Sequence, residues 1–153
     1  MQYWLMKSEP EAFSIEDLMN ASHQTTCWDG VRNYQARNFM KQMKIGDLVF
    51  FYHSNCKVPG IIGIARVCKE AYPDFTAQDP TDIHYDSKST PEKPIWEMVD
   101  LQFVKKFKEV LSLHQLHQYP ELHAMPLLRK GNRLSVMPVT ENQWHFILQH
   151  VST

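Results

Sequence analysis

Glycine, cysteine and net charge are all scarce in this chain, and each scarcity excludes a class of protein. There are only five glycines, and no glycine-rich fingerprint for a nucleotide or methyl-donor cofactor is present, so we expect no cofactor. Sixteen Lys and Arg face seventeen Asp and Glu, which leaves the chain nearly neutral. Proteins that hold nucleic acid by its backbone alone are strongly basic. Any binding of nucleic acid must therefore depend on a local patch and a specific pocket.

The cysteines and the apolar runs also exclude two environments. Cys27, Cys56 and Cys68 are an odd number at wide spacing, which is not typical of a disulfide framework. No apolar run approaches the roughly 20 residues of a membrane-spanning helix. Residues 3–7 have the pattern of a strand rather than of a secretory leader. We therefore expect a cytoplasmic protein with free thiols and no membrane partner.

The length and organisation of the chain predict one domain over residues 1–153. It has no internal repeat, no low-complexity tract and no linker between two cores. The loosest stretch runs from Pro73 to Pro94, with two further prolines inside it. We interpret it as a long loop of the same domain, of the kind that is often functional or mobile.

Hydrophobic patterns and capping residues predict five strands and four helices. The strands are expected over residues 3–6, 48–52, 61–67, 96–107 and 133–139. The helices are expected to begin at Ser14, Asn33, Ser112 and Thr140. Because strands and short helices do not alternate strictly, the order predicts an α+β fold, a small mixed barrel with peripheral helices.

The helix that begins at Asn33 has a cationic face. Its polar positions, at i, i+4, i+8 and i+11, are Asn33, Arg37, Lys41 and Lys44. Trp28 lies just before this helix, in a turn that we expect to expose its ring. A Trp beside cations suits stacking on a base while Arg or Lys contacts phosphate. The alternative is a solvated helix face and a Trp in the core.

Polar residues also follow two predicted strands. Tyr52, His53 and Ser54 end a buried strand, where small-ligand sites often lie, although they also fit an ordinary loop. Glu9, after the first strand, is a candidate acceptor for the amino group of a base. It is equally a surface acid before a turn. A last acid-free stretch suits phosphate contact or simple solvation, and contains Arg129, Lys130, Arg133 and Ser135.

Metal and catalytic motifs are weak. His114 and His117 are three residues apart, but no Cys or carboxylate completes a recognisable ligand set, so we expect no metal site. Cys27 and Cys56 belong to no motif that pairs a nucleophile with a base.

Several segments, taken in order, resemble the EVE domain. The most specific are YWLMKSEP at 3–10, WDGVRNYQARNFM at 28–40, KIGDLVFFYHSN at 44–55, PGIIGIARV at 59–67 and NRLSVMPVT at 132–140. Because their order holds from end to end, the resemblance covers nearly the whole chain. It implies a PUA-like mixed β-barrel that binds modified bases, such as cytosine derivatives in DNA or RNA, without catalysis.

Residue type and position within these segments suggest a set of site residues. A modified base is read after it leaves the base stack and enters a pocket with aromatic walls. The candidate walls are Trp28 and Tyr52. The candidate readers of the base edge are Ser8, Glu9, His53 and Ser54. The residues expected to grip the backbone or the base are Asn33, Arg37, Arg133 and Ser135.

Two other functions stay open from the sequence. One is an enzyme that acts on nucleic-acid bases, for which Glu9 and His53 would be the acid and base. The other is an adaptor whose aromatic surface binds a protein partner.

Overall fold

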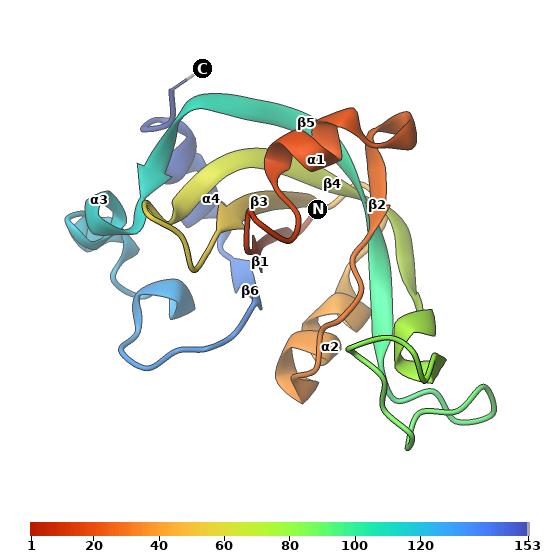
Figure 1. Cartoon of the computed structure of the whole chain (residues 1–153). Coiled ribbons are helices and arrows are strands. Elements are labelled where there is room, and N and C mark those ends of the chain that lie inside the picture. Colours follow the sequence, from red (N-terminus) through yellow and green to blue (C-terminus); the bar gives the residue numbers. More distant parts are fainter. Residues whose placement is uncertain (153) are drawn as a thin grey trace.

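The computed structural model describes residues 1–152, and its centre is one curved sheet of six strands (Figure 1). The strands are β1 (Tyr3–Ser8), β2 (Thr25–Cys27), β3 (Leu48–His53), β4 (Gly60–Pro73), β5 (Glu97–Ser112) and β6 (Val136–Val139). Their spatial order is β2-β5-β4-β3-β1-β6. β1 and β3 run parallel, whereas all other neighbours pair antiparallel. This mixed sheet with peripheral helices confirms the predicted α+β class.

The helices of the described chain begin where their capping residues predict. They are α1 (Ile15–Asn20), α2 (Tyr34–Gln42), α3 (Leu113–His117) and α4 (Glu141–Leu148). Ser14, Ser112 and Thr140 each form the predicted capping box, in which two free backbone N–H groups are satisfied reciprocally. The side chain of Asn33 accepts from the backbone N–H of Ala36 and so caps α2. Short 3-10 helices are η1 (Ser22–Gln24), η2 (Phe75–Gln78), η3 (Pro120–Leu122) and η4 (Pro126–Leu128).

The central strands bury both of their faces, because successive side chains point to opposite sides of a sheet. Trp4 of β1 and Phe51 of β3 pack with α1 and α2 in what we call the first core cluster. Their neighbours Leu5 and Phe50 pack with α3 and α4 in the second core cluster. The sheet therefore lies between two helical layers.

The structure differs most from the predicted strands in four places. β4 continues to Pro73, beyond the predicted end at residue 67. β2 was not predicted, because its three residues are too few to show an alternating pattern. β5 continues to Ser112, beyond the predicted end at residue 107. β6 begins at Val136 rather than at residue 133, because residues 129–135 form a loop beside the site described below. Within residues 1–152, no helix is both long and apolar enough to cross a membrane.

Candidate functional site

A cavity of about 600 Å³ opens where the end of β1, the segment after β2 and the β4–β5 loop come together. This volume is within the range of small-ligand sites. The residues that line it are Lys7, Ser8, Glu9, Ala12, Phe13, Thr26, Cys27, Trp28, Asp29, Gly30, Val31, Arg32, His84 and Ser135. The predicted residues Ser8, Glu9, Trp28 and Ser135 are therefore brought together in one cavity.

Trp28 forms an aromatic wall of this first cavity, but its ring is not exposed as the sequence predicted. Only 8% of the residue is accessible. The ring packs edge-on against Phe51 and Phe13, with centroids 5.4 and 6.5 Å away. Its backbone N–H donates to the carbonyl of Val99 on β5, which anchors the segment at the end of β2. The prediction of an exposed ring is wrong because the core of the domain extends to the cavity wall.

The indole N–H of Trp28 is not fully buried. It has no hydrogen-bond partner among residues 1–152. Every fully buried side-chain nitrogen or oxygen in that range does have a partner. The indole N–H is therefore accessible to solvent. A donor beside an aromatic face is a typical means of orienting a planar polar ligand.

Polar groups at the end of β1 form the opposite side of the cavity. The Ser8 hydroxyl donates to the carbonyl of Phe13 at 2.7 Å, which fixes the segment that carries the Phe13 ring. The exposed carboxylate of Glu9 accepts one bond from the side-chain amide of Asn55 at 2.8 Å. Burial lowers the pKa of Lys7, whose ammonium lies 5.6 Å from the Tyr52 ring centroid. Polar groups of Lys7, Ser8 and Glu9 thus line the same cavity as the Trp28 ring.

The pKa values of an acid and a thiol beside Trp28 are raised. Burial raises the pKa of Asp29, and the negative charge of Asp74 raises it further. Burial also raises the pKa of the Cys27 thiol, with a smaller contribution from Asp29. Because the thiolate is the nucleophilic form, Cys27 is a poor nucleophile. No group of three His, Cys, Asp or Glu residues within residues 1–152 is arranged to hold a metal ion.

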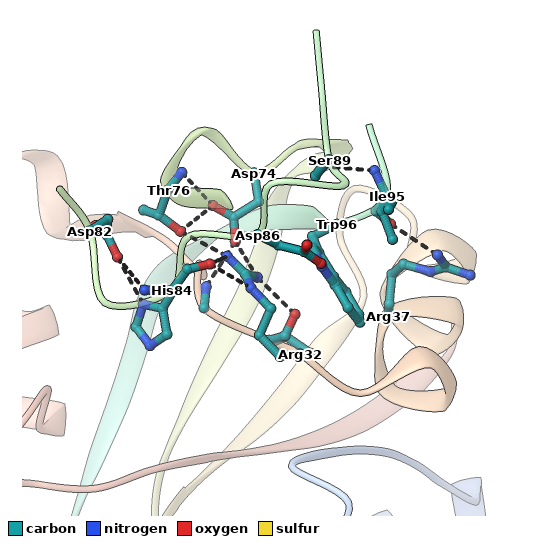
Figure 2. Close-up of polar contacts among 12 residues, drawn as sticks. Arg32, Arg37, Asp74, Thr76, Asp82, His84, Asp86, Ser89, Ile95 and Trp96 are labelled. Carbon is teal, nitrogen blue, oxygen red and sulfur yellow. Dashed lines mark hydrogen bonds and ion pairs between the residues drawn. The ribbon is translucent and has the colours of Figure 1, made fainter. Parts of the chain in front are cut away.

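The far wall of the cavity is the β4–β5 loop, which Asp74 ties to the rest of the domain (Figure 2). The buried Asp74 carboxylate accepts from the Gly30 N–H at 2.8 Å, from Thr76, and from Arg32 at 3.0 Å. Burial alone would raise the pKa of Asp74, but these hydrogen bonds outweigh burial and the pKa lies below its ordinary value. Arg32 also donates to the carbonyl of His84 at 2.8 and 2.9 Å. The β4–β5 loop, which contains the stretch that the sequence indicated as the loosest, is therefore fixed by hydrogen bonds. The same bonds hold His84 at the cavity.

Arg37 supports the same loop instead of lining the cavity (Figure 2). Its guanidinium donates to the carbonyl of Ile95 at 2.9 Å and lies 5.0 Å from the Tyr34 ring. Tyr34 in turn stacks on Trp96 at 4.8 Å. Arg37 therefore has a structural role, because it links α2 to the residues just before β5.

The three residues predicted at the end of β3 also lie outside the cavity lining. Tyr52 is 2% exposed and packs in the second core cluster, where burial raises its pKa to about 12. The ring of His53 accepts the backbone N–H of Ile15 at 3.1 Å, and burial lowers its pKa. The backbone N–H of Ser54 donates to the carbonyl of Ser8 at 3.0 Å. These residues position α1 and the end of β1.

Asn33 and Arg133 lie together in a second cavity of about 400 Å³. This second cavity is bordered by the start of α2 and by the loop between η4 and β6. Ser135, two residues beyond Arg133, lines the first cavity instead, and its carbonyl accepts from the N–H of Lys7 at 2.8 Å. The four residues predicted to grip the backbone or the base thus lie in three places. Ser135 lines the first cavity, Asn33 and Arg133 line the second, and Arg37 contacts the β4–β5 loop.

Phe13, Gly30 and His84 line the first cavity but were not predicted. Gly30 had a local signal, since Asp-Gly is a turn dipeptide and Gly30 has a φ of +78°. A Cβ atom at Gly30 would lie 2.7 Å from the His84 ring, so the close approach needs glycine. His84 had no signal, because only the folding of the β4–β5 loop brings it to Gly30.

Comparison with known proteins gives a consistent result. The family model described as the EVE domain matches residues 2–150. Thymocyte nuclear protein 1 of Rattus norvegicus is 50% identical over an alignment of 163 positions that covers 95% of this chain and 72% of the rat protein.

Solved structures agree over nearly the whole chain. A Pseudomonas syringae protein superposes with a TM-score of 0.93 and 55% identity, covering 97% of this chain and 98% of that one. The human THYN1 protein, solved in complex with DNA containing 5-methylcytosine, has a TM-score of 0.91 and 48% identity over 98% of this chain and 97% of its own. The predicted PUA-like class is confirmed.

Proposed function

This chain belongs to the EVE domain family, and we propose that it binds nucleic acid and holds a modified base of the 5-methylcytosine type in the first cavity. The cavity itself is the observation that supports the proposal most. It combines the aromatic wall of Trp28 with polar groups at the end of β1 and with Glu9 just beyond it, in a volume of about 600 Å³. The human relative bound to DNA with 5-methylcytosine indicates the class of ligand.

A base reaches such a cavity only after it leaves the base stack. Enzymes and readers that need the whole base flip it into a pocket with aromatic walls, at a cost of a few kcal/mol. Trp28 and Phe13, at 87° to one another, offer the ring contacts that offset this cost. The nearly neutral chain fits a pocket reader better than a protein that only attracts phosphates.

The polar groups suit the edge of a cytosine. A carboxylate accepts from the amino group of cytosine, and Glu9, which lines the cavity, would make this contact. The indole N–H of Trp28 would donate to the base carbonyl or ring nitrogen. The additional methyl group would then contact apolar side chains such as Val31, and one methyl group contributes discrimination of about 10–200-fold.

We propose binding without catalysis, because the acid and base named by the enzyme hypothesis, Glu9 and His53, do not meet in the cavity. Glu9 is bonded to Asn55, whereas the ring nitrogen of His53 accepts from the Ile15 backbone. The pair required by the enzyme hypothesis is therefore engaged in two separate contacts. Cys27, the thiol at the cavity, is held in its protonated form by burial.

The first test is a fluorescence titration with DNA and RNA oligonucleotides that carry either cytosine or 5-methylcytosine. Trp4, Trp96 and Trp144 are 1–5% exposed and do not line the cavity, so a change in emission should come from Trp28. We expect tighter binding of the methylated strand, with a preference that persists as salt rises. The Trp28→Phe variant should lose most of the signal. Equal affinity for plain and methylated strands at every salt concentration would refute the proposal.

A further inference from the structure

The second cavity is cationic and has no acid in its lining. Three of its residues are Arg129, Lys130 and Arg133, and the remainder are neutral. This concentration of positive charge occurs in a chain whose net charge is −1. It therefore forms a local positive field that the overall composition does not indicate.

The three cations have no ion-pair partner between residues 1 and 152. Some cations elsewhere in the described chain are ion-paired: Arg32 pairs with Asp74 at 3.0 Å, and Lys106 pairs with Glu16 at 3.1 Å. Arg129, Lys130 and Arg133 are exposed, and their side chains donate no hydrogen bond to any described residue. Their donors are thus available to an anion from outside the chain.

The loop that carries the cations is held in shape by Asn132. Its side-chain amide donates to the carbonyl of Pro126, and its side-chain oxygen accepts from the N–H of Leu134 at 2.9 Å. Gly131 next to it has a φ of +77°, a backbone conformation that glycine adopts without strain. The cations therefore project from an ordered loop, which lowers the entropy lost when they bind a ligand.

The two cavities share a wall. Val31 and Arg32 line the first cavity, and the next residue, Asn33, lines the second. On the other side Ser135 lines the first cavity, and its neighbour Leu134 lines the second. The same two chain segments, residues 31–33 and 134–135, thus border both cavities.

We propose that the second cavity binds a backbone phosphate of the DNA strand whose modified base occupies the first cavity. This inference rests on the proposed function and adds to it the direction in which the strand leaves the base cavity. The strand would run from the first cavity across residues 31–33 and 134–135 to the cations of the loop. The second cavity would supply affinity without reading the base, since phosphates carry no sequence information.

The test compares a triple variant, Arg129→Gln with Lys130→Gln and Arg133→Gln, with a control that loses the same charge. The control is Lys57→Gln with Lys105→Gln and Lys108→Gln, three exposed cations that line neither cavity. Fluorescence anisotropy would measure the affinity of each protein for plain and methylated duplex DNA from low to moderate salt.

We expect the triple variant to bind both DNAs at least about tenfold more weakly, with an unchanged ratio between them. The slope of log affinity against log salt should fall in magnitude by about 2–3. The slope of log affinity against log salt for the control should differ from that of the wild type by about 1 or less. The single variant Asn132→Ala keeps every charge but frees the loop, and should weaken both DNAs with a smaller change of slope.

An unchanged slope in the triple variant, or an equal loss in the control, would overturn the inference. A triple variant that loses its preference for methylated DNA, and not its affinity for both, would also overturn it. Failure of the proposed function looks different: wild-type protein would bind the two DNAs equally while the triple variant still lost its salt dependence.

Discussion

At the scale of single residues, Trp28 combines two roles that are often treated as alternatives. It is a core residue, because its ring packs on Phe51 and only 8% of it is accessible. It is also a wall of the first cavity, with an accessible indole N–H. A rigid aromatic wall loses little entropy when a base stacks against it. The same burial means that Trp28→Ala would test stability as much as binding.

Glu9 offers a cleaner test of the base cavity. The Glu9→Gln variant replaces one acceptor oxygen by a donor, and should lower the affinity for methylcytosine DNA by about tenfold or more. Anisotropy titrations would measure the loss. The matched control is Glu11→Gln, an exposed acid two residues along the chain that does not line the cavity. Equal effects of the two variants would show that only net charge matters.

Gly30 tests whether the position of His84 matters to the ligand. An added Cβ would lie 2.7 Å from the His84 ring, so Gly30→Ala should displace the ring and weaken DNA binding. The control is Gly46→Ala, because Gly46 also has a positive φ, +95°, but nothing lies within 4 Å of an added Cβ. Both variants should lose about 1–2 kcal/mol of stability in urea denaturation from backbone strain. Unaltered DNA affinity in Gly30→Ala would exclude a role for His84.

At the scale of elements, the β4–β5 loop behaves as a fixed wall, because the buried Asp74 carboxylate accepts from the segment after β2 and from the loop itself. Asp74 bonds to Gly30, Arg32 and Thr76. Sequence alone indicated a long proline-containing loop, and such loops are often mobile. The hydrogen bonds to a charged, buried acceptor explain why this one is ordered.

The Asp74→Asn variant should open this loop. Loss of the charge should lower the free energy of unfolding by about 2–4 kcal/mol. Hydrogen-deuterium exchange should increase across residues 74–89, beyond the change elsewhere. Glu92→Gln, an exposed acid of the same loop without a hydrogen-bond partner among the described residues, serves as the control. Protection of the loop that survives in Asp74→Asn would contradict the assigned role.

The lowered pKa of Asp74 also predicts how the loop responds to acid. Because the folded-state pKa is below the unfolded value of about 3.9, the stabilisation is complete above that pH. It is lost as the pH falls through the folded-state pKa. Exchange in the loop, corrected for intrinsic rates, should therefore rise below about pH 4 in the wild type. In the Asp74→Asn variant, exchange in the loop should already be high at pH 7. If its exchange changed with pH in the same way as that of the wild type, Asp74 would not be the group responsible.

At the scale of the whole molecule, the two core clusters share the strands β1 and β3. Trp4 and Phe51 contribute to the first cluster, and Leu5 and Phe50 contribute to the second. Loss of packing in one cluster therefore removes support from the strands on which the other cluster packs. The domain should therefore unfold in one cooperative transition, as most single domains of this size do.

Ile147→Ala tests this coupling from α4, far along the chain from the first cavity. Ile147 is fully buried in the second cluster, and its truncation should cost about 2–5 kcal/mol. Tryptophan fluorescence and far-UV circular dichroism should report the same lowered midpoint. The neighbouring Leu148→Ala, at a residue that is 36% exposed, should change stability by about 0.5 kcal/mol or less. Separate midpoints for the two probes would show that the clusters unfold independently.

The sequence by itself determined the local elements and the family. Capping at Ser14, Ser112 and Thr140 follows from residues three apart, and the apolar run at β3 follows from adjacent residues. Such signals are read within one turn or one strand, so no tertiary information is needed. The order of the family segments along the chain likewise belongs to the sequence.

Only the tertiary structure decided which side chains line the cavities. Trp28 lines the first cavity whereas Tyr52 is enclosed in the second core cluster, although both are aromatic residues at the end of a strand. Alternation along a strand tells which residues share a face, but not which face adjoins a cavity. His84 and Ser135 reach the first cavity through long-range packing, as Arg129 and Asn33 reach the second. Their juxtaposition depends on the whole sheet, and no local pattern in the sequence encodes it.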